Sequence, residues 1–117
     1  MQVQGDKYSI TYQSETETVR CAGFLDLRGK DGYKDIADLL DKVAARSPSP
    51  EKIILDVKDL EFLNSSGITT IGGFVIKLRK KEGIRLLIQC ANKHSWQSRS
   101  MTGLQTLMPG SLEITFE

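Results

Sequence analysis

The chain has 117 residues, of which 39% are hydrophobic, a length that suits one compact domain with a core of its own. Its 16 Lys and Arg are balanced by 15 Asp and Glu, so a net charge of +1 provides no long-range attraction toward nucleic acid or anionic lipid. We expect a cytoplasmic protein, because the first residues do not resemble a secretory signal and no apolar run approaches the roughly 20 residues of a membrane helix.

The first half of the chain predicts two strands, a helix and a central strand. Apolar residues alternate over 8–12 and 19–25, and the polar residues between these runs suit a hairpin turn. Residues 32–45 carry an apolar stripe with helical spacing, and Asp31 is placed to cap its first turn. The aliphatic run 53–57 is typical of a central strand that is covered on both faces or nearly so.

The second half predicts alternating helices and strands. A helix is expected from about Ser66 to Glu82, with Gly83 suited to the left-handed residue that ends it. Its apolar stripe, expected to face the sheet, is Ile68, Ile71, Val75 and Leu78. Residues 85–90 repeat the buried-strand pattern, 95–107 form a weaker helix, and 112–116 alternate as a last strand. We expect 53–57 and 85–90 to be adjacent parallel strands joined by the helix between them. This order predicts an α/β fold: a mixed, mainly parallel sheet of about five strands with about three helices packed against it.

The segment Leu60-Glu-Phe-Leu-Asn-Ser-Ser-Gly-Ile68 follows the central strand and opens a helix at the carboxyl edge of the sheet, where open α/β folds place ligands. Asn64 is a good N-cap residue, which puts Ser65 and Ser66 in the first helical turn. Free backbone N–H groups and the positive end of the helix dipole favour a bound or covalent phosphate there. Residue chemistry alone leaves open that these residues only cap a helix.

The same segment resembles the D-S-S-G signature of the anti-sigma-factor antagonists, whose domain is called STAS. The surrounding frame is similar too, since Gly23-Phe-Leu-Asp26 resembles the family's G-x-L-D element and Gly83-Ile-Arg-Leu-Leu-Ile88 its G-x-x-L-x-x strand. Three more pieces also match: the strand end Leu55-Asp56-Val57, the Leu-x-Phe element after it, which is expected in a short loop, and the Gly103-Leu104 pair. The resemblance covers nearly the whole chain and implies a single STAS-like domain over residues 1–117.

The resemblance implies a regulatory protein that switches between protein partners and is not an enzyme. In the family the first Ser of the signature is phosphorylated by a partner Ser/Thr kinase, and Ser65 occupies that position. The implied partners are an anti-sigma factor with a histidine-kinase-like ATPase fold and a phosphatase, without a cofactor or metal. The partner-binding residues implied are Asp26, Asn64, Ser65, Ser66 and Gly67.

The chain departs from the family pattern at several positions. Asn64 replaces the usual Asp and removes a fixed negative charge, although Asn and Asp are similar N-caps, so Asn64→Asp is expected to leave stability unchanged or slightly higher. The opening of the first helix, Gly29–Tyr33, lacks the usual small residues. Gly72 and Gly73 inside the motif helix indicate either close approach to the sheet or a flat partner surface. The alternative is a non-phosphorylated scaffold, or a ligand-sensing or lipid-transport accessory domain, of the same fold.

Other candidate sites have simpler explanations. Cys21 and Cys90 lie far apart in apolar runs and are expected to be buried thiols. The only histidine, His94, has no catalytic partners in the sequence, and neither a phosphate loop nor a G-x-S-x-G elbow is present. The basic cluster between Lys77 and Lys81 suits the negative end of a helix dipole, so it does not require a nucleic-acid partner.

Overall fold

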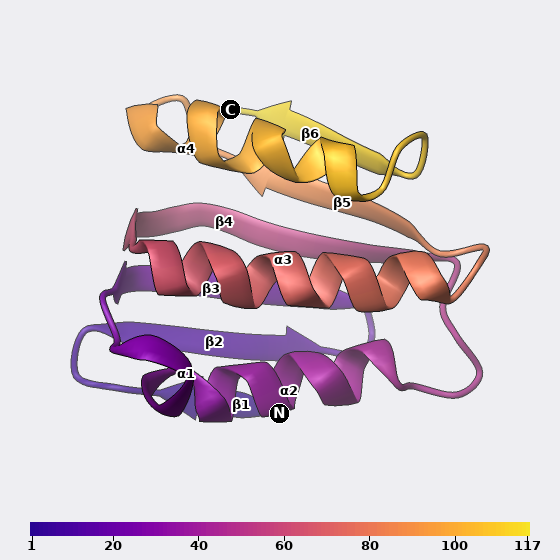
Figure 1. The fold of residues 1–117 in the computed structure, drawn as a ribbon, viewed down its shortest axis with the longest axis horizontal. Helices are drawn as coiled ribbons and strands as arrows, with labels where there is room; N and C mark the ends of the chain where they lie inside the picture. The colour runs from indigo at the N-terminus through magenta and orange to yellow at the C-terminus, as the bar shows by residue number, and fades with distance from the viewer.

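The computed structural model, which describes residues 1–117, contains a six-stranded sheet in the order β1-β2-β3-β4-β5-β6 (Figure 1). The strands β1, β2 and β3 pair antiparallel, and β3 to β6 pair parallel. The strands are β1 (Gln2–Gln4), β2 (Tyr8–Gln13), β3 (Thr18–Leu25), β4 (Lys52–Leu63), β5 (Arg85–Cys90) and β6 (Leu112–Phe116).

The helices all cover the same face of the sheet (Figure 1). Right-handed crossovers between parallel strands that advance in one direction across a sheet place every connecting helix on one side. No helix combines the length and the apolar character that a membrane crossing requires. The helices are α1 (Gly29–Gly32), α2 (Lys34–Ala44), α3 (Ser65–Lys80), α4 (Ser95–Thr102) and the 3-10 helix η1 (Gly103–Leu107).

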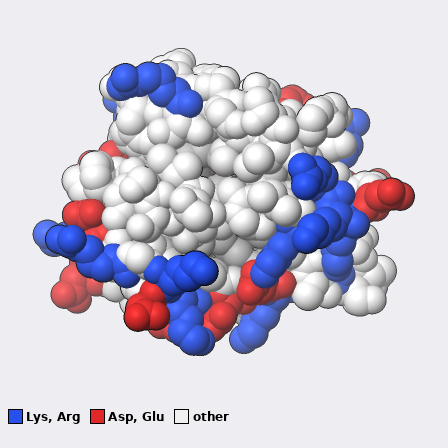
Figure 2. Space-filling view, viewed as in Figure 1, with Lys and Arg blue, Asp and Glu red and all other residues white.

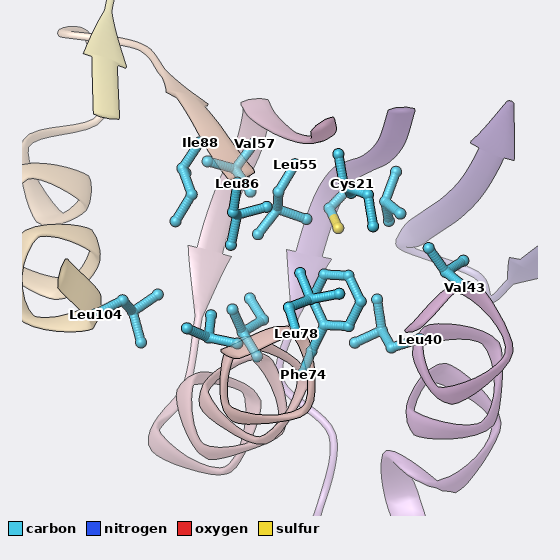
Figure 3. Packing of buried hydrophobic residues seen from close by; sticks show 14 of the residues in the cluster. Cys21, Leu40, Val43, Leu55, Val57, Phe74, Leu78, Leu86, Ile88 and Leu104 are labelled. Atoms are coloured by element: carbon cyan, nitrogen blue, oxygen red, sulfur yellow. The ribbon is translucent and has the colours of Figure 1, made fainter. Parts of the chain in front are cut away.

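The core lies between the helices and this face of the sheet and contains 28 buried hydrophobic residues. Figure 3 shows side chains of the sheet, among them Leu55 and Leu86, facing Phe74 and Leu78 of α3. The helix α3 therefore packs centrally on the sheet.

Two predictions about the parallel half of the sheet are confirmed. Residues 53–57 and 85–90 lie in neighbouring parallel strands, with Ile53 opposite Leu86, and α3 connects them. The predicted apolar stripe of α3 faces the core, since Ile71, Val75 and Leu78 are buried and Ile68 packs against them from a half-buried position. The mixed, mainly parallel sheet of the predicted fold class is thus present.

The sheet differs from the prediction in two respects. It has six strands instead of about five, because β1 pairs with β2. The three residues of β1 contain only one apolar side chain, which is too few to show an alternating pattern in the sequence. The strand β4 also continues through the Leu-x-Phe element to Leu63, because Phe62 and Leu63 pair with the end of β3. The element expected to be a loop is therefore the end of a central strand.

Residues 53–57, predicted to be covered on both faces or nearly so, are covered by helices on one face only. Ile53, Leu55 and Val57 are buried, but Ile54 and its register partner Leu87 are only half-buried. Because the helices lie on one side only, these two side chains face the open side of the sheet. The aliphatic run is continuous because Ile54 lies beside Leu87 on that open side.

The first and third helices are also divided differently. Residues 29–44 form α1 and α2, and Tyr33 occupies the position between them without a side-chain capping bond. Asp31 lies inside α1 and does not cap the longer helix as predicted, because the chain is already helical from Gly29. The predicted 95–107 helix is α4 followed by η1, which tightens at Gly103.

Candidate functional site

The turn Asn64–Gly67 connects the end of β4 to the first turn of α3 at the carboxyl edge of the parallel strands (Figure 1, left end of α3). The backbone N–H of Asn64 donates to the carbonyl of Leu25 at the end of β3, with a distance of 3.1 Å. This contact brings the G-x-L-D element and the D-S-S-G-like segment together, as their shared edge of the sheet requires.

The side-chain amide of Asn64 uses both of its ends. Its oxygen accepts from the backbone N–H of Gly67 at 3.0 Å, which confirms the predicted N-cap. Its nitrogen donates to the carbonyl oxygen of Leu27 at 2.7 Å and to the Asp26 carboxylate at 3.2 Å. Two acceptors at one end and a donor at the other fix the orientation of the amide. Asn64 thus cross-links the start of α3 to the segment that follows β3.

Tyr33 makes a second contact with the capping residue Asn64. Its buried hydroxyl lies 2.6 Å from the Asn64 amide oxygen and 3.1 Å from the Leu25 carbonyl oxygen. Burial raises the pKa of the Tyr33 hydroxyl, so it remains a donor at neutral pH. The sequence pattern places Tyr33 only in an apolar stripe, and no local signal indicates that its hydroxyl reaches Asn64 at the start of another helix.

Gly67 is required by close packing. A Cβ atom at this position would lie 2.2 Å from Cδ1 of Leu63 and 2.7 Å from the Tyr33 hydroxyl. The residue is buried, so it shapes the turn from inside and presents no side chain to a partner. Any larger residue would have to push Tyr33 or Leu63 aside, and the cap would be distorted.

The hydroxyl groups near the turn differ in their availability. Thr69 and Thr70 donate to the carbonyls of Ser65 and Ser66, one helical turn back, at 3.1 and 2.9 Å. The Ser65 side chain is exposed and the Ser66 side chain is half-buried, and neither hydroxyl bonds within the protein. Ser65 is therefore the most accessible hydroxyl of the first turn.

The surface of α3 that follows this turn carries no charged side chain over its first three turns. The first charged residue of α3 is Lys77, and no acidic residue lies in the first turn. Figure 2 shows a broad uncharged area on the helical face, with Lys, Arg, Asp and Glu gathered toward its rim. A phosphate placed at Ser65 would be a strong local change of potential on such a surface.

Neither glycine inside α3 is explained by close approach to the sheet. Gly72 is buried beside η1, but a Cβ there would make only ordinary contacts, 3.7 Å from Leu107 and 4.0 Å from Leu104. Gly73 is exposed, and a Cβ there would meet no atom within 4 Å. Internal packing therefore accounts for neither glycine.

The remaining candidates have structural roles. Lys77 pairs with Asp41 of α2, and Arg79 donates to the carbonyl of Leu107 at 3.2 Å, so the basic cluster also ties α3 to its neighbours. Burial raises the pKa of the Cys21 thiol to about 12 and that of Cys90 to about 11, as expected for inert thiols. No group of His, Cys, Asp and Glu side chains is arranged to hold a metal ion.

Sequence reasoning missed one buried polar residue. Gln97 of α4 is fully buried, and its amide nitrogen donates to the carbonyls of Val57 and Leu60 at 2.7 and 2.9 Å. Its amide oxygen accepts from the N–H of Ala91 at 2.8 Å. Gln97 therefore fastens α4 to β4, where the register against β3 shifts. A lone Gln in a polar helix gives no signal of this role.

The one-sided α/β sheet and the capped turn at its carboxyl edge are the features of a STAS-type domain. The family model of the STAS domain matches residues 13–115, and the chain belongs to this family. A solved chain in the crystal structure of the diguanylate cyclase SiaD in complex with its activator SiaC, from Pseudomonas aeruginosa, has the same fold. The TM-score is 0.69 at 11% identity, covering 100% of this chain and 99% of that chain. No curated protein matches the chain in sequence.

Proposed function

We propose that the chain is a non-enzymatic regulator that docks on a protein partner through the turn Asn64–Gly67 and is controlled by phosphorylation of Ser65. The docking turn is defined here as Asn64, Ser65, Ser66 and Gly67 together with Asp26. The partner proposed is a histidine-kinase-like Ser/Thr kinase of the anti-sigma type, with a phosphatase that reverses the modification.

The observation that carries this proposal is the contrast between Ser65 and its surroundings. The Asn64 amide and the close packing of Gly67 hold the turn in one shape, whereas the Ser65 hydroxyl is exposed and bonds to nothing. A rigid turn with one exposed, unbonded hydroxyl at a helix N-terminus favours both access for a kinase and stabilisation of the product phosphate.

A phosphate at Ser65 would act through charge and bulk. It adds about −1.5 to −2 charges to a surface that has no charge before Lys77 on the same helix. The helix N-terminus stabilises this charge in the free protein, while an uncharged partner surface loses contact with it. A tenfold loss of affinity requires only about 1.4 kcal/mol, which is well within this range.

The partner class draws support from the family and from one solved neighbour. The STAS family match is consistent with a protein that regulates by binding. The structural neighbour comes from a complex between an enzyme and its activator, which makes a signalling enzyme a reasonable second partner class for this fold. These likenesses support partner binding.

The proposal is tested by mapping phosphorylation on protein purified from its host and by quantitative pull-down of the candidate kinase. We expect phosphate on Ser65, full partner binding by Ser65→Ala, and weaker binding by Ser65→Asp. The partial effect of Asp is expected because one carboxylate has less charge than a phosphate. Ser66→Ala and Ser66→Asp are matched controls, since that half-buried side chain is one residue away.

The alternative is a constitutive scaffold of the same fold, and one observation favours it. The Asn64 amide donates to Leu27 and Asp26, so the position is specialised for a neutral amide where the family usually has an acid. Equal partner binding by Ser65→Ala and Ser65→Asp, or phosphate confined to Ser66, Thr69 or Thr70, would rule out the switch and leave the scaffold.

A further inference from the structure

A cleft of about 790 Å³ opens beside the docking turn and is not explained by the proposed switch. One wall is the β1–β2 turn, residues 5–8, and the opposite wall is formed by Phe24 and Phe62 at the ends of β3 and β4, with Asp26 and Leu27 beside them. The cleft contains neither Ser65 nor Ser66 and shares only Asp26 with the docking turn.

Two exposed aromatic rings line this cleft. Phe24 and Phe62 are 47% and 42% exposed, and they are register partners on neighbouring strands. The register between β3 and β4 shifts at Gly23, directly before Phe24, and such bulges re-aim side chains. Exposed rings placed side by side in a concave site are typical of a binding surface.

The β1–β2 turn, residues 5–8, is held at a fixed distance from the two phenylalanine rings. The N–H of Phe24 donates to the carbonyl of Lys7 at 2.8 Å, and the N–H of Gly5 donates to the carbonyl of Tyr8 at 3.0 Å. A Cβ on Gly23, which has φ +92, would lie 2.1 Å from the Lys7 carbonyl oxygen. Only glycine permits this approach, so the cleft is a built feature of the fold.

The charges in the cleft indicate the kind of ligand. Asp6 and Asp26 supply two carboxylates against the single ammonium of Lys7. One oxygen of Asp26 accepts from the Asn64 amide, which orients the carboxylate and leaves its other oxygen free. A net negative rim over aromatic rings is complementary to a cation with an apolar stem.

We propose that this cleft binds an arginine side chain presented by a short segment of a protein partner. A guanidinium stacks on aromatic faces and also donates several hydrogen bonds in the plane of the group, so it can contact the rings and the free oxygen of Asp26 together. The compact ammonium of lysine does not combine the two contacts in this way. Its aliphatic stem, and an apolar neighbour in the segment, cover Leu27 and the two rings. The volume exceeds that of one side chain and suits a short segment.

The test is to titrate the full chain with the blocked peptide Gly-Leu-Arg-Leu-Gly and to monitor binding by two-dimensional amide NMR. Matched peptides carry citrulline, lysine or glutamate in place of arginine. We expect shifts confined to residues 5–8, 24–27 and 62, and binding of the citrulline peptide at least about tenfold weaker. Phe24→Ser, Phe62→Ser and Asp26→Asn should each weaken binding severalfold, and Asp26→Asn keeps the oxygen that accepts from Asn64.

Phe116→Ser is the matched control, because Phe116 is an exposed Phe outside the cleft, and it should leave binding unchanged. Equal binding of the arginine, citrulline and lysine peptides would overturn the guanidinium site, as would stronger binding of the glutamate peptide. Absence of shifts in the cleft at about 5 mM peptide, or a dimer that Phe24→Ser abolishes, would also overturn it. None of these outcomes depends on phosphorylation, so the switch at Ser65 is tested separately.

Discussion

Asn64→Asp provides the sharpest test of the site, because capping chemistry and the observed network predict opposite results. As an N-cap, Asp should equal Asn and gain about 0.3 to 1 kcal/mol from the helix dipole. In the structure, however, the amide nitrogen donates to the Leu27 carbonyl at 2.7 Å and to the Asp26 carboxylate at 3.2 Å. The substitution removes both donors and places an anionic oxygen against two acceptors.

The magnitude follows from these contacts. A neutral hydrogen bond contributes about 0.5 to 1.5 kcal/mol, and a bond to a charged group somewhat more when it is not fully exposed. Two carboxylates about 3 to 4 Å apart near a surface add at least about 1 kcal/mol of repulsion. After the gain from the dipole is subtracted, Asn64→Asp should lower the free energy of unfolding by about 2 to 3 kcal/mol at neutral pH.

The assay is urea unfolding followed by fluorescence of Trp96, the single tryptophan of the chain. The pKa of the introduced carboxyl should be raised in the folded state, because its surroundings disfavour the anion. A raised folded pKa means that the penalty is absent below the unfolded value of about 3.9 and develops as the pH rises through the folded pKa. The variant should therefore approach the parent protein in stability near about pH 4.

Two further variants separate donor loss from charge. Asn64→Ser keeps a capping oxygen without adding charge, so its deficit should be smaller and should not change with pH in this range. Combining Asn64→Asp with Asp26→Asn reverses the donor and the acceptor and should recover part of the loss, while the contact with Leu27 remains unfavourable. A single Asn64→Asp variant as stable as the parent at pH 7 would refute the reasoning.

The remaining predictions concern packing, docking and burial. Ile71→Ala should cost about 2 to 4 kcal/mol, since Ile71 is 4% exposed, and a loss below about 0.5 kcal/mol would place it on the wrong face. Gly73→Ala should raise the free energy of unfolding by up to about 1 kcal/mol, because the added Cβ meets no atom within 4 Å. If this variant also binds the partner more weakly, the docking surface extends along α3, whereas unchanged binding would limit that surface to the docking turn. Gln97→Leu should cost at least about 2 kcal/mol by leaving two carbonyls of β4 and one backbone N–H unpaired, and a near-neutral result would contradict its anchoring role. Burial raises the pKa of the Cys21 thiol to about 12, so the stability contributed by the neutral thiol is complete below the ordinary pKa of about 8.5 and is lost as the pH rises toward 12. The free energy of unfolding of Cys21→Ala should therefore fall less steeply with pH in this range than that of the parent protein. An identical pH dependence of the two proteins would count against this burial effect.

The parts of the fold that follow from local periodicity were predictable from the sequence. The stripe of α3 and the pairing of 53–57 with 85–90 follow from spacing and from the handedness of crossovers. The cap at Asn64 is likewise a local interaction, since its acceptor role involves a residue three positions later. Such features require no knowledge of distant contacts.

The features that were missed all depend on contacts between distant segments. Asn64 donates to a carbonyl 37 positions away, and nothing in its own segment shows that this carbonyl lies within reach. The one-sided covering of β4 is a property of the strand order, so the run around Ile54 could not distinguish it from a fully covered strand. Gln97 and the aromatic cleft depend on irregular register between β3 and β4, which periodicity does not encode.

The Tyr33 hydroxyl has one hydrogen and two acceptors, the Leu25 carbonyl and the Asn64 amide oxygen, so it can donate to only one of them at a time. The two arrangements interconvert by rotation of a single O–H bond and leave the heavy atoms in place. This hydroxyl joins the α1–α2 junction to the start of α3, 31 positions away, and it also packs closely against Gly67. These two segments should therefore open as one unit in amide hydrogen exchange, and the protection of Gly67 should report the integrity of both.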